Sequence, residues 1–98
     1  GTTATTAPTI DTVTPNSLAL YIAMERTAAD DGAATINNGF TINHDAHTIG
    51  GDNLQALLVA SKAMATPGAV GATTATFTKS HATNSAAVLI AIPPKATP

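Results

Sequence analysis

The chain has 98 residues, enough for one domain, and a net charge of −2 with only four Lys and Arg residues. Four scattered cations form no basic patch for phosphate groups, so we exclude nucleic-acid binding from the expected functions. The absence of cysteine excludes disulfides and thiolate metal sites. No apolar run approaches the roughly 20 residues that a membrane-spanning helix needs.

The composition predicts a thin hydrophobic core. Apolar residues make up 44% of the chain, but many are alanine and only three residues are aromatic. Large side chains contribute about 1.5–3 kcal/mol each on burial, so an alanine-rich core is marginal by itself. Without disulfides, we expect partner subunits to complete it. The chain starts at Gly1 and not at Met, which indicates a processed product, an excised domain or an expression remnant.

Residues 1–9 (GTTATTAPT) are rich in Thr and Ala. They predict a flexible arm or, alternatively, an edge strand that pairs with a neighbour, because Thr favours strands and proline is confined to edges. We therefore divide the chain into an arm at 1–9 and a β domain at 10–98. The arm residues that we expect to contact other subunits are Thr2, Thr3, Thr5 and Thr6.

Residues 17–24 follow the turn residues Pro15 and Asn16 and alternate in size with period two. This pattern predicts a strand with its bulky face toward the core. A helix is the alternative, since Ala, Leu and Met favour one. The bulky residues are Leu18, Leu20, Ile22 and Met24. Tyr21 lies on the opposite face, where we expect it to contact another subunit or to be buried against a neighbouring subunit or sheet.

The middle of the chain is rich in turns. Residues 25–39 predict a loop or loose hairpin, since Asp-Gly at 31–32 and Asn-Gly at 38–39 are strong turn signals. Residues 40–44 predict a short strand with Phe40 and Ile42 facing inward. A turn around Gly50-Gly51 follows.

Residues 54–64 (LQALLVASKAM) fit a helix face, with an Asp-Asn pair as a possible N-cap, but we favour a strand because the neighbouring elements are β. A Pro/Gly loop at 65–72 precedes two runs, 74–79 and 86–92, which we expect to form a hairpin. The run 86–92 (AAVLIAI) is apolar on both faces, which predicts a central strand covered on both sides. The whole pattern predicts an all-β fold, a six- to seven-stranded antiparallel β-sandwich with jelly-roll or immunoglobulin-like topology.

The sequence favours no catalytic, cofactor or metal site. In a strand, His44 and His47 point to opposite faces and lack a third ligand. Asp30-Asp31-Gly32 resembles the start of a calcium loop, but Ala33, Ala34 and Ile36 interrupt the alternation of oxygen ligands. Ser80 and His81 are adjacent and would lie on opposite sides of a strand, unsuited to a catalytic triad.

Three lysines are interpreted as solvated residues at sheet edges, where a charge discourages pairing with another chain. They are Lys62, Lys79 and Lys95.

Five segments follow a loose pattern in order. They are 16–20 (NSLAL), 39–41 (GFT), 50–54 (GGDNL), 65–71 (ATPGAVG) with 75–77 (ATF), and 85–94 (SAAVLIAIPP). This series resembles short β-sandwich modules of bacteriophage virion and tail-associated proteins. Two positions depart from that pattern, because Phe40 stands where Trp is frequent and Ser85 where an aromatic residue is frequent. Both changes thin the core.

The resemblance implies a non-enzymatic structural subunit or domain of a phage particle, located in the virion as a capsid decoration or part of the tail. Its partners would be other copies of itself and other virion proteins, with no nucleic acid and no membrane. Two alternatives remain: a secreted or surface-displayed carbohydrate-binding module, and a subunit of an extracellular filament assembled by strand exchange through the arm.

Overall fold

The computed structural model describes residues 3–27, 33–47, 54–77 and 82–95. These ranges contain strands and turns but no helix, and every strand pair is antiparallel. The predicted all-β antiparallel fold is thus confirmed. The strands are β1 (Thr3–Ala7), β2 (Asp11–Thr12), β3 (Ser17–Thr27), β4 (Ala34–Ile36), β5 (Thr41–His47), β6 (Leu54–Met64), β7 (Gly68–Ala69), β8 (Thr73–Phe77) and β9 (Ala82–Ile92).

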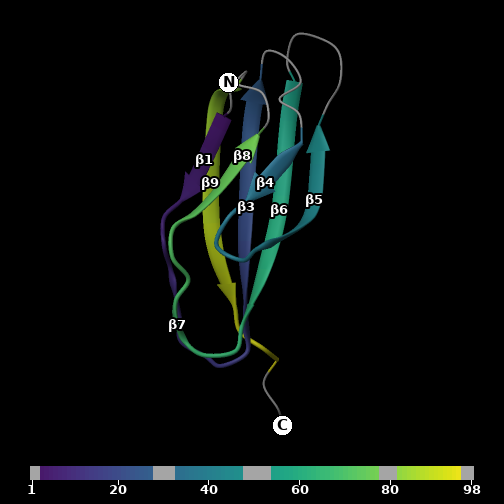
Figure 1. The fold of residues 1–98 in the computed structure, drawn as a ribbon. Helices are drawn as coiled ribbons and strands as arrows, with labels where there is room; N and C mark the ends of the chain where they lie inside the picture. The colour runs from purple at the N-terminus through teal and green to yellow at the C-terminus, as the bar shows by residue number, and fades with distance from the viewer. Residues whose placement is uncertain (1–2, 28–32, 48–53, 78–81, 96–98) are drawn as a thin grey trace.

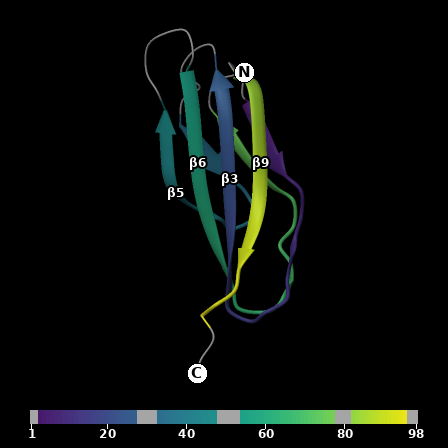
Figure 2. The ribbon, with the colours of Figure 1, turned by 180° about the vertical axis from the view of Figure 1, so that it is seen from behind.

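The strands are arranged in two layers. A four-stranded sheet has the order β5-β6-β3-β9, and a three-stranded sheet has the order β1-β8-β4. Figure 1 shows the smaller sheet in front of the larger one, and Figure 2 shows the larger sheet from behind. At one side of the molecule β1 lies beside β9, and at the other side β4 lies near β5. β2 and β7 pair with each other, and in Figure 1 β7 lies below the smaller sheet, beside the lower end of the larger one.

The described residues contain nine strands, where the sequence predicted six or seven. The difference comes from short strands, because β2 and β7 have two residues each and β4 has three. β4 also lies within the segment 25–39, which was predicted to be a loop or loose hairpin. A three-residue strand is too short for its alternation to be recognised in a sequence.

The long strands lie where the sequence placed them. β3 covers the predicted run 17–24 and continues to Thr27, and β6 has the predicted bounds 54–64. β6 is a strand despite its helical composition because it lies between β3 and β5 and pairs with both. The inward orientation of Phe40 and Ile42 at the start of β5 is also confirmed, since both pack in the core.

The predicted C-terminal hairpin is wrong. β8 pairs with β1 and β4 in the smaller sheet, whereas β9 pairs with β3 in the larger one. The four residues between them can span about 13 Å, enough to cross the roughly 10 Å that separates two packed sheets. β9 is therefore an edge strand of its sheet, and not the central strand that its two-sided apolar sequence indicated.

The bulky face of β3 also lies opposite to its predicted side. Ala19, Tyr21 and Ala23 are buried between the layers, whereas Met24 and the other bulky residues of β3 point away from the smaller sheet. Only a few large side chains fill the interlayer space, and an interior packed in this way resists added methylene groups. The buried core consists of Ala7, Ala19, Tyr21, Ala23, Phe40, Leu58, Ala60, Val70, Ala75, Phe77 and Leu89.

A type I′-like turn connects the layers between β4 and β5. Asn38 and Gly39 have φ angles of 61° and 75°, as the Asn-Gly signal predicts. The Asn38 Nδ2 atom donates to the Val70 carbonyl at 2.6 Å, and Lys62 Nζ donates to the Asn38 carbonyl at 2.9 Å. Lys62 is therefore not a solvated edge residue, because β6 is an inner strand and its amine holds this turn.

A buried side-chain hydrogen bond joins the two layers, in which the Tyr21 hydroxyl donates to the Thr5 carbonyl at 2.6 Å. We predict that Tyr21→Phe lowers the free energy of unfolding by about 1–2 kcal/mol, because it removes this donor from a buried site. Urea unfolding followed by circular dichroism measures the change.

The matched control is Thr6→Val, which removes a hydroxyl from the exposed side of β1. The Thr6 hydroxyl bonds the Thr74 hydroxyl at 2.8 Å near solvent, so we expect a change of less than about 0.5 kcal/mol. Equal stability of Tyr21→Phe and the unmodified chain would contradict the role given to Tyr21.

Candidate interaction surface

The side of the larger sheet that faces away from the smaller sheet carries bulky aliphatic residues on three neighbouring strands. Strand alternation and register place them in rows, in which Leu18 pairs with Ile92 and Ile22 lies between Val88 and Val59. We call this surface the outer apolar face. It consists of Leu18, Leu20, Ile22 and Met24 of β3, Leu57 and Val59 of β6, and Ala86, Val88, Ile90 and Ile92 of β9.

Much of this face is exposed to solvent. Met24 is 63% exposed and Val88 is 47% exposed, and four further residues of the face lie between 38% and 41%. Together they make up six of the seven exposed large hydrophobic residues in the described part of the chain. Single exposed hydrophobic residues are normal on a protein surface, but a contiguous patch marks an interaction site.

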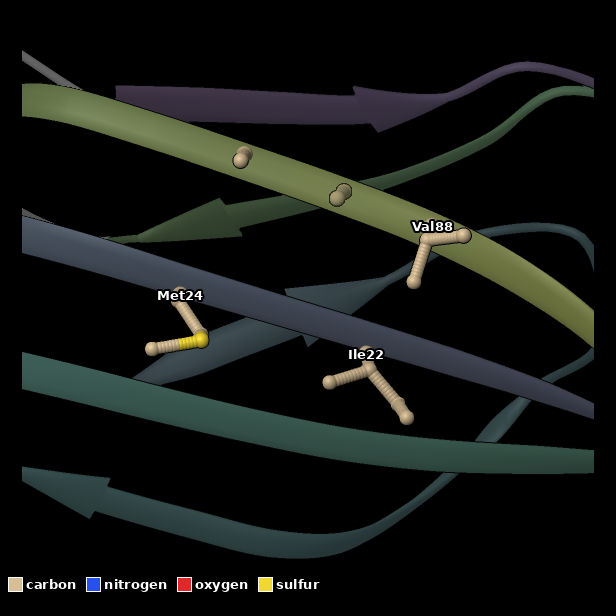
Figure 3. A pocket seen from close by; sticks show the side chains of 5 residues that line it. Ile22, Met24 and Val88 are labelled. Carbon is tan, nitrogen blue, oxygen red and sulfur yellow. The ribbon is translucent and has the colours of Figure 1, made fainter.

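The face is uneven toward the end that contains Met24. Figure 3 shows Ile22 and Met24 from β3 and Val88 from β9 standing around a shallow hollow. The hollow has a volume of about 160 Å³, and the alanines at 86 and 87 complete its lining. No lining residue is polar or titratable, so the hollow can accept an apolar side chain but offers no group for catalysis or metal binding.

Polar residues border the outer apolar face. On the β5 side, Asn43 and His44 are exposed, and the Ser61 hydroxyl donates to Asn43 Oδ1 at 2.7 Å. An apolar centre with a polar border is the usual composition of a protein–protein interface.

The outer side of the smaller sheet has the opposite character. Its outward positions are mainly threonines, and Thr6 and Thr74 bond each other through their hydroxyls at 2.8 Å. Thr35 donates to the Thr76 carbonyl at 3.5 Å. These polar side chains suit contact with water. The two layers therefore share one core but differ on their outer sides, and among the described residues only those of the larger sheet form an aliphatic surface.

The residues predicted to contact subunits lie elsewhere. Thr2 lies outside the described residues, and β1, which contains Thr3, Thr5 and Thr6, pairs with β8 of the same chain. Thr5 is buried, whereas Thr6 is exposed. Tyr21 is fully buried between the layers, so it contacts the neighbouring sheet and does not reach the surface. Strand exchange through the arm stays a prediction. It would require β1 to separate from β8 of its own chain and to pair with another copy.

The outer apolar face was missed because the bulky side of β3 was assigned to the core. The run 86–92 did contain a signal, since its apolar residues on both sides require two coverings. Within one chain, β9 receives only one covering, on the side of Leu89.

The residues weighed for metal binding or catalysis do not form a site within the described residues. His44 is exposed on the outer side of β5, whereas Asp45 Oδ2 accepts a hydrogen bond from the Ala34 amide at 3.0 Å toward the smaller sheet. The described residues contain no group of three or more His, Cys, Asp or Glu side chains placed to hold a metal. The segments 30–32 and 80–81, and the side chain of His47, lie outside the described part.

Comparison with protein-family models, with curated proteins and with solved structures gives no match for this chain. Among the described residues there is no helix long and apolar enough to cross a membrane.

The assignment of the two sides of β3 is testable with a pair of neighbouring substitutions. We predict that Ala23→Leu lowers the free energy of unfolding by about 1–3 kcal/mol, because it adds three carbons to the closed space between the layers. Met24→Thr, on the exposed side, should change it by less than about 0.5 kcal/mol. Urea unfolding at low protein concentration measures both.

If the bulky side of β3 formed the core, Met24→Thr would lower the free energy of unfolding more than Ala23→Leu. That result would contradict the orientation described here.

Proposed function

We propose that this protein is a non-enzymatic structural module that acts by docking its outer apolar face against another protein in an assembled particle. The observation that carries the proposal is the position of this face. It lies on the far side of a sheet whose inner side already provides the core, so it adds nothing further to the chain's own interior.

Apolar surface that leaves water stabilises a complex by roughly 25 cal/mol per Å². Six large aliphatic residues, each more than a third exposed, offer this term only to a partner. The described part of the face carries no charged side chain, so covering it incurs no cost for desolvating an ion.

The particle that we propose is a bacteriophage virion, with the module on the capsid or in the tail. Its support is the resemblance of the segments 16–20, 39–41, 65–71 and 85–94 to virion-associated β modules. A structural role also agrees with the chemistry of the face, which is apolar and lacks titratable groups. The partners would be other virion proteins and further copies of the chain, without nucleic acid or membrane.

We also propose that the two layers form a sandwich related in strand order to the immunoglobulin fold, and not a jelly roll. In that fold, strands A, B, E and D form one sheet and strands C, F and G the other. β3, β6 and β5 correspond to B, E and D, and β4 and β8 to C and F. The first and last strands are exchanged, because β9 lies beside β3 and β1 beside β8.

A glycan-binding function is less well supported. Carbohydrate-binding β modules use exposed aromatic platforms, but all three aromatic residues of this chain are buried in the core. They are Tyr21, Phe40 and Phe77.

Particle association is tested by banding phage particles in a density gradient and measuring the chain by mass spectrometry. We expect the unmodified chain in the particle band at a fixed ratio to the other particle proteins. The variant Val88→Thr/Ile90→Thr, expressed in its place, should be reduced in the band at least about tenfold, because it places two hydroxyls in the apolar contact.

Val13→Thr is the matched control, since Val13 is exposed but lies outside the face, between β2 and β3. It should enter particles like the unmodified chain. An unmodified chain found only in the soluble fraction would contradict the proposed function.

A further inference from the structure

We propose that the partner that covers the outer apolar face is a second copy of this chain, packed face to face in a two-fold symmetric dimer. The inference rests on the docking role proposed above and names its partner. It would give β9 the second covering that its sequence requires.

No described segment of the chain provides this covering. The longest segment outside the described residues has six residues, 48–53, and its sequence TIGGDN contains one large aliphatic residue. The arm at the N-terminus is already paired with β8. We therefore assign the covering to a second copy of the chain.

The size of the face suits a dimer. Strand spacings of about 4.8 Å and a rise of about 3.3 Å per residue give the larger sheet an outer side on the order of 600 Å² in projection. The accessible surface is larger than the projection, because side chains protrude from the sheet. A standard interface buries about 800 Å² per partner. The outer apolar face would form the centre of this contact and the polar residues of β5 its border.

The charge distribution permits self-association. Each chain carries a net charge of −2, so two copies repel each other weakly at a distance. The described side chains of the outer apolar face are uncharged, and Lys62 and Asp45, which belong to the same sheet, are engaged on its inner side. As far as the described side chains extend, bringing two such faces together therefore places no like charges in contact.

The shape of the face is compatible with a copy of itself. A two-fold contact requires one patch to carry both the protrusion and its matching recess. Here the hollow beside Ala86 and Ala87 lies next to Met24, the most exposed residue of the face. Methionine is flexible and adapts to irregular gaps. Two face-to-face sheets pack about 10 Å apart with interdigitated side chains, so Met24 of one copy would enter the hollow of the other.

The thin core adds a reason for the chain to associate. Five of the eleven residues of the buried core are alanine, and the chain has no cysteine. A domain of this size that lacks both a large core and a disulfide gains stability from oligomerisation.

The test uses the purified full chain and needs no other component. Light scattering and sedimentation should show the mass rising with concentration, across the micromolar range, from 9.7 kDa to twice that value. Val88→Thr/Ile90→Thr should raise the dissociation constant about 100-fold, whereas Val13→Thr should leave it unchanged. Circular dichroism confirms that each variant keeps its β fold.

The two native methionines provide a second measurement that needs no substitution. Met24 lies on the face, whereas Met64 packs against the core. In ¹³C-methyl NMR, dilution through the dissociation range should shift the Met24 signal and leave that of Met64 in place.

Each outcome decides. A chain that stays monomeric at several hundred micromolar overturns the dimer. So does a dimer that survives Val88→Thr/Ile90→Thr with an unmoved Met24 signal, because it would use another surface, such as the edge of β1. A monomeric chain that still enters particles through this face would overturn the dimer but leave the docking function standing.

Discussion

The structure depends on the alternation along β3, which separates small residues and one ring from bulky aliphatic residues. Among the described side chains of β3, Tyr21 is the only large one between the layers, and its hydroxyl reaches Thr5 on the far sheet. Ala19 and Ala23 on either side of it leave room for Phe77 and Leu58. A shift of β3 by one residue would exchange the two sides completely, exposing the ring and forcing Leu, Ile and Met into the interlayer space.

The same alternation explains which parts of the fold could be predicted. Period two in 17–24 and apolar density in 54–64 and 86–92 predict strands whatever their surroundings, and Asn38-Gly39 predicts its turn because both residues tolerate a positive φ. Pairing could not be predicted from nearness in sequence. β8 and β9 are separated by four residues, yet they lie in different sheets because a short link suffices to cross between layers.

The candidate surface could not be predicted because the size of a hydrophobic side chain does not by itself show whether that side chain is buried. Where one side of a strand is polar, the bulky side is the core side. In β3 both sides are apolar, so size alone cannot tell a core from an interface. Which side of β3 is buried depends on the space that the opposite layer leaves. Its buried residues Ala75 and Phe77 leave room for the Tyr21 ring and the alanines of β3, but not for a row of large aliphatic side chains. That information lies in β8, about fifty residues away in the sequence.

The distribution of aliphatic residues links this error to the proposed role. In the described chain three large aliphatic residues, Leu58, Val70 and Leu89, are buried in the core and four more are half-buried against it, whereas the outer apolar face contains nine, counting all but Ala86. A domain that functions as an isolated monomer would place most of its large aliphatic residues inside, where each contributes most to stability. The outer side of the smaller sheet shows that this chain can form a polar surface, since Thr6, Thr35 and Thr74 face solvent there. The aliphatic surface of the larger sheet is therefore specific to that sheet, and its composition is that of half an interior. The thin core and the bulky outer face then have the same explanation, because part of the hydrophobic interior forms only when the chain binds its partner.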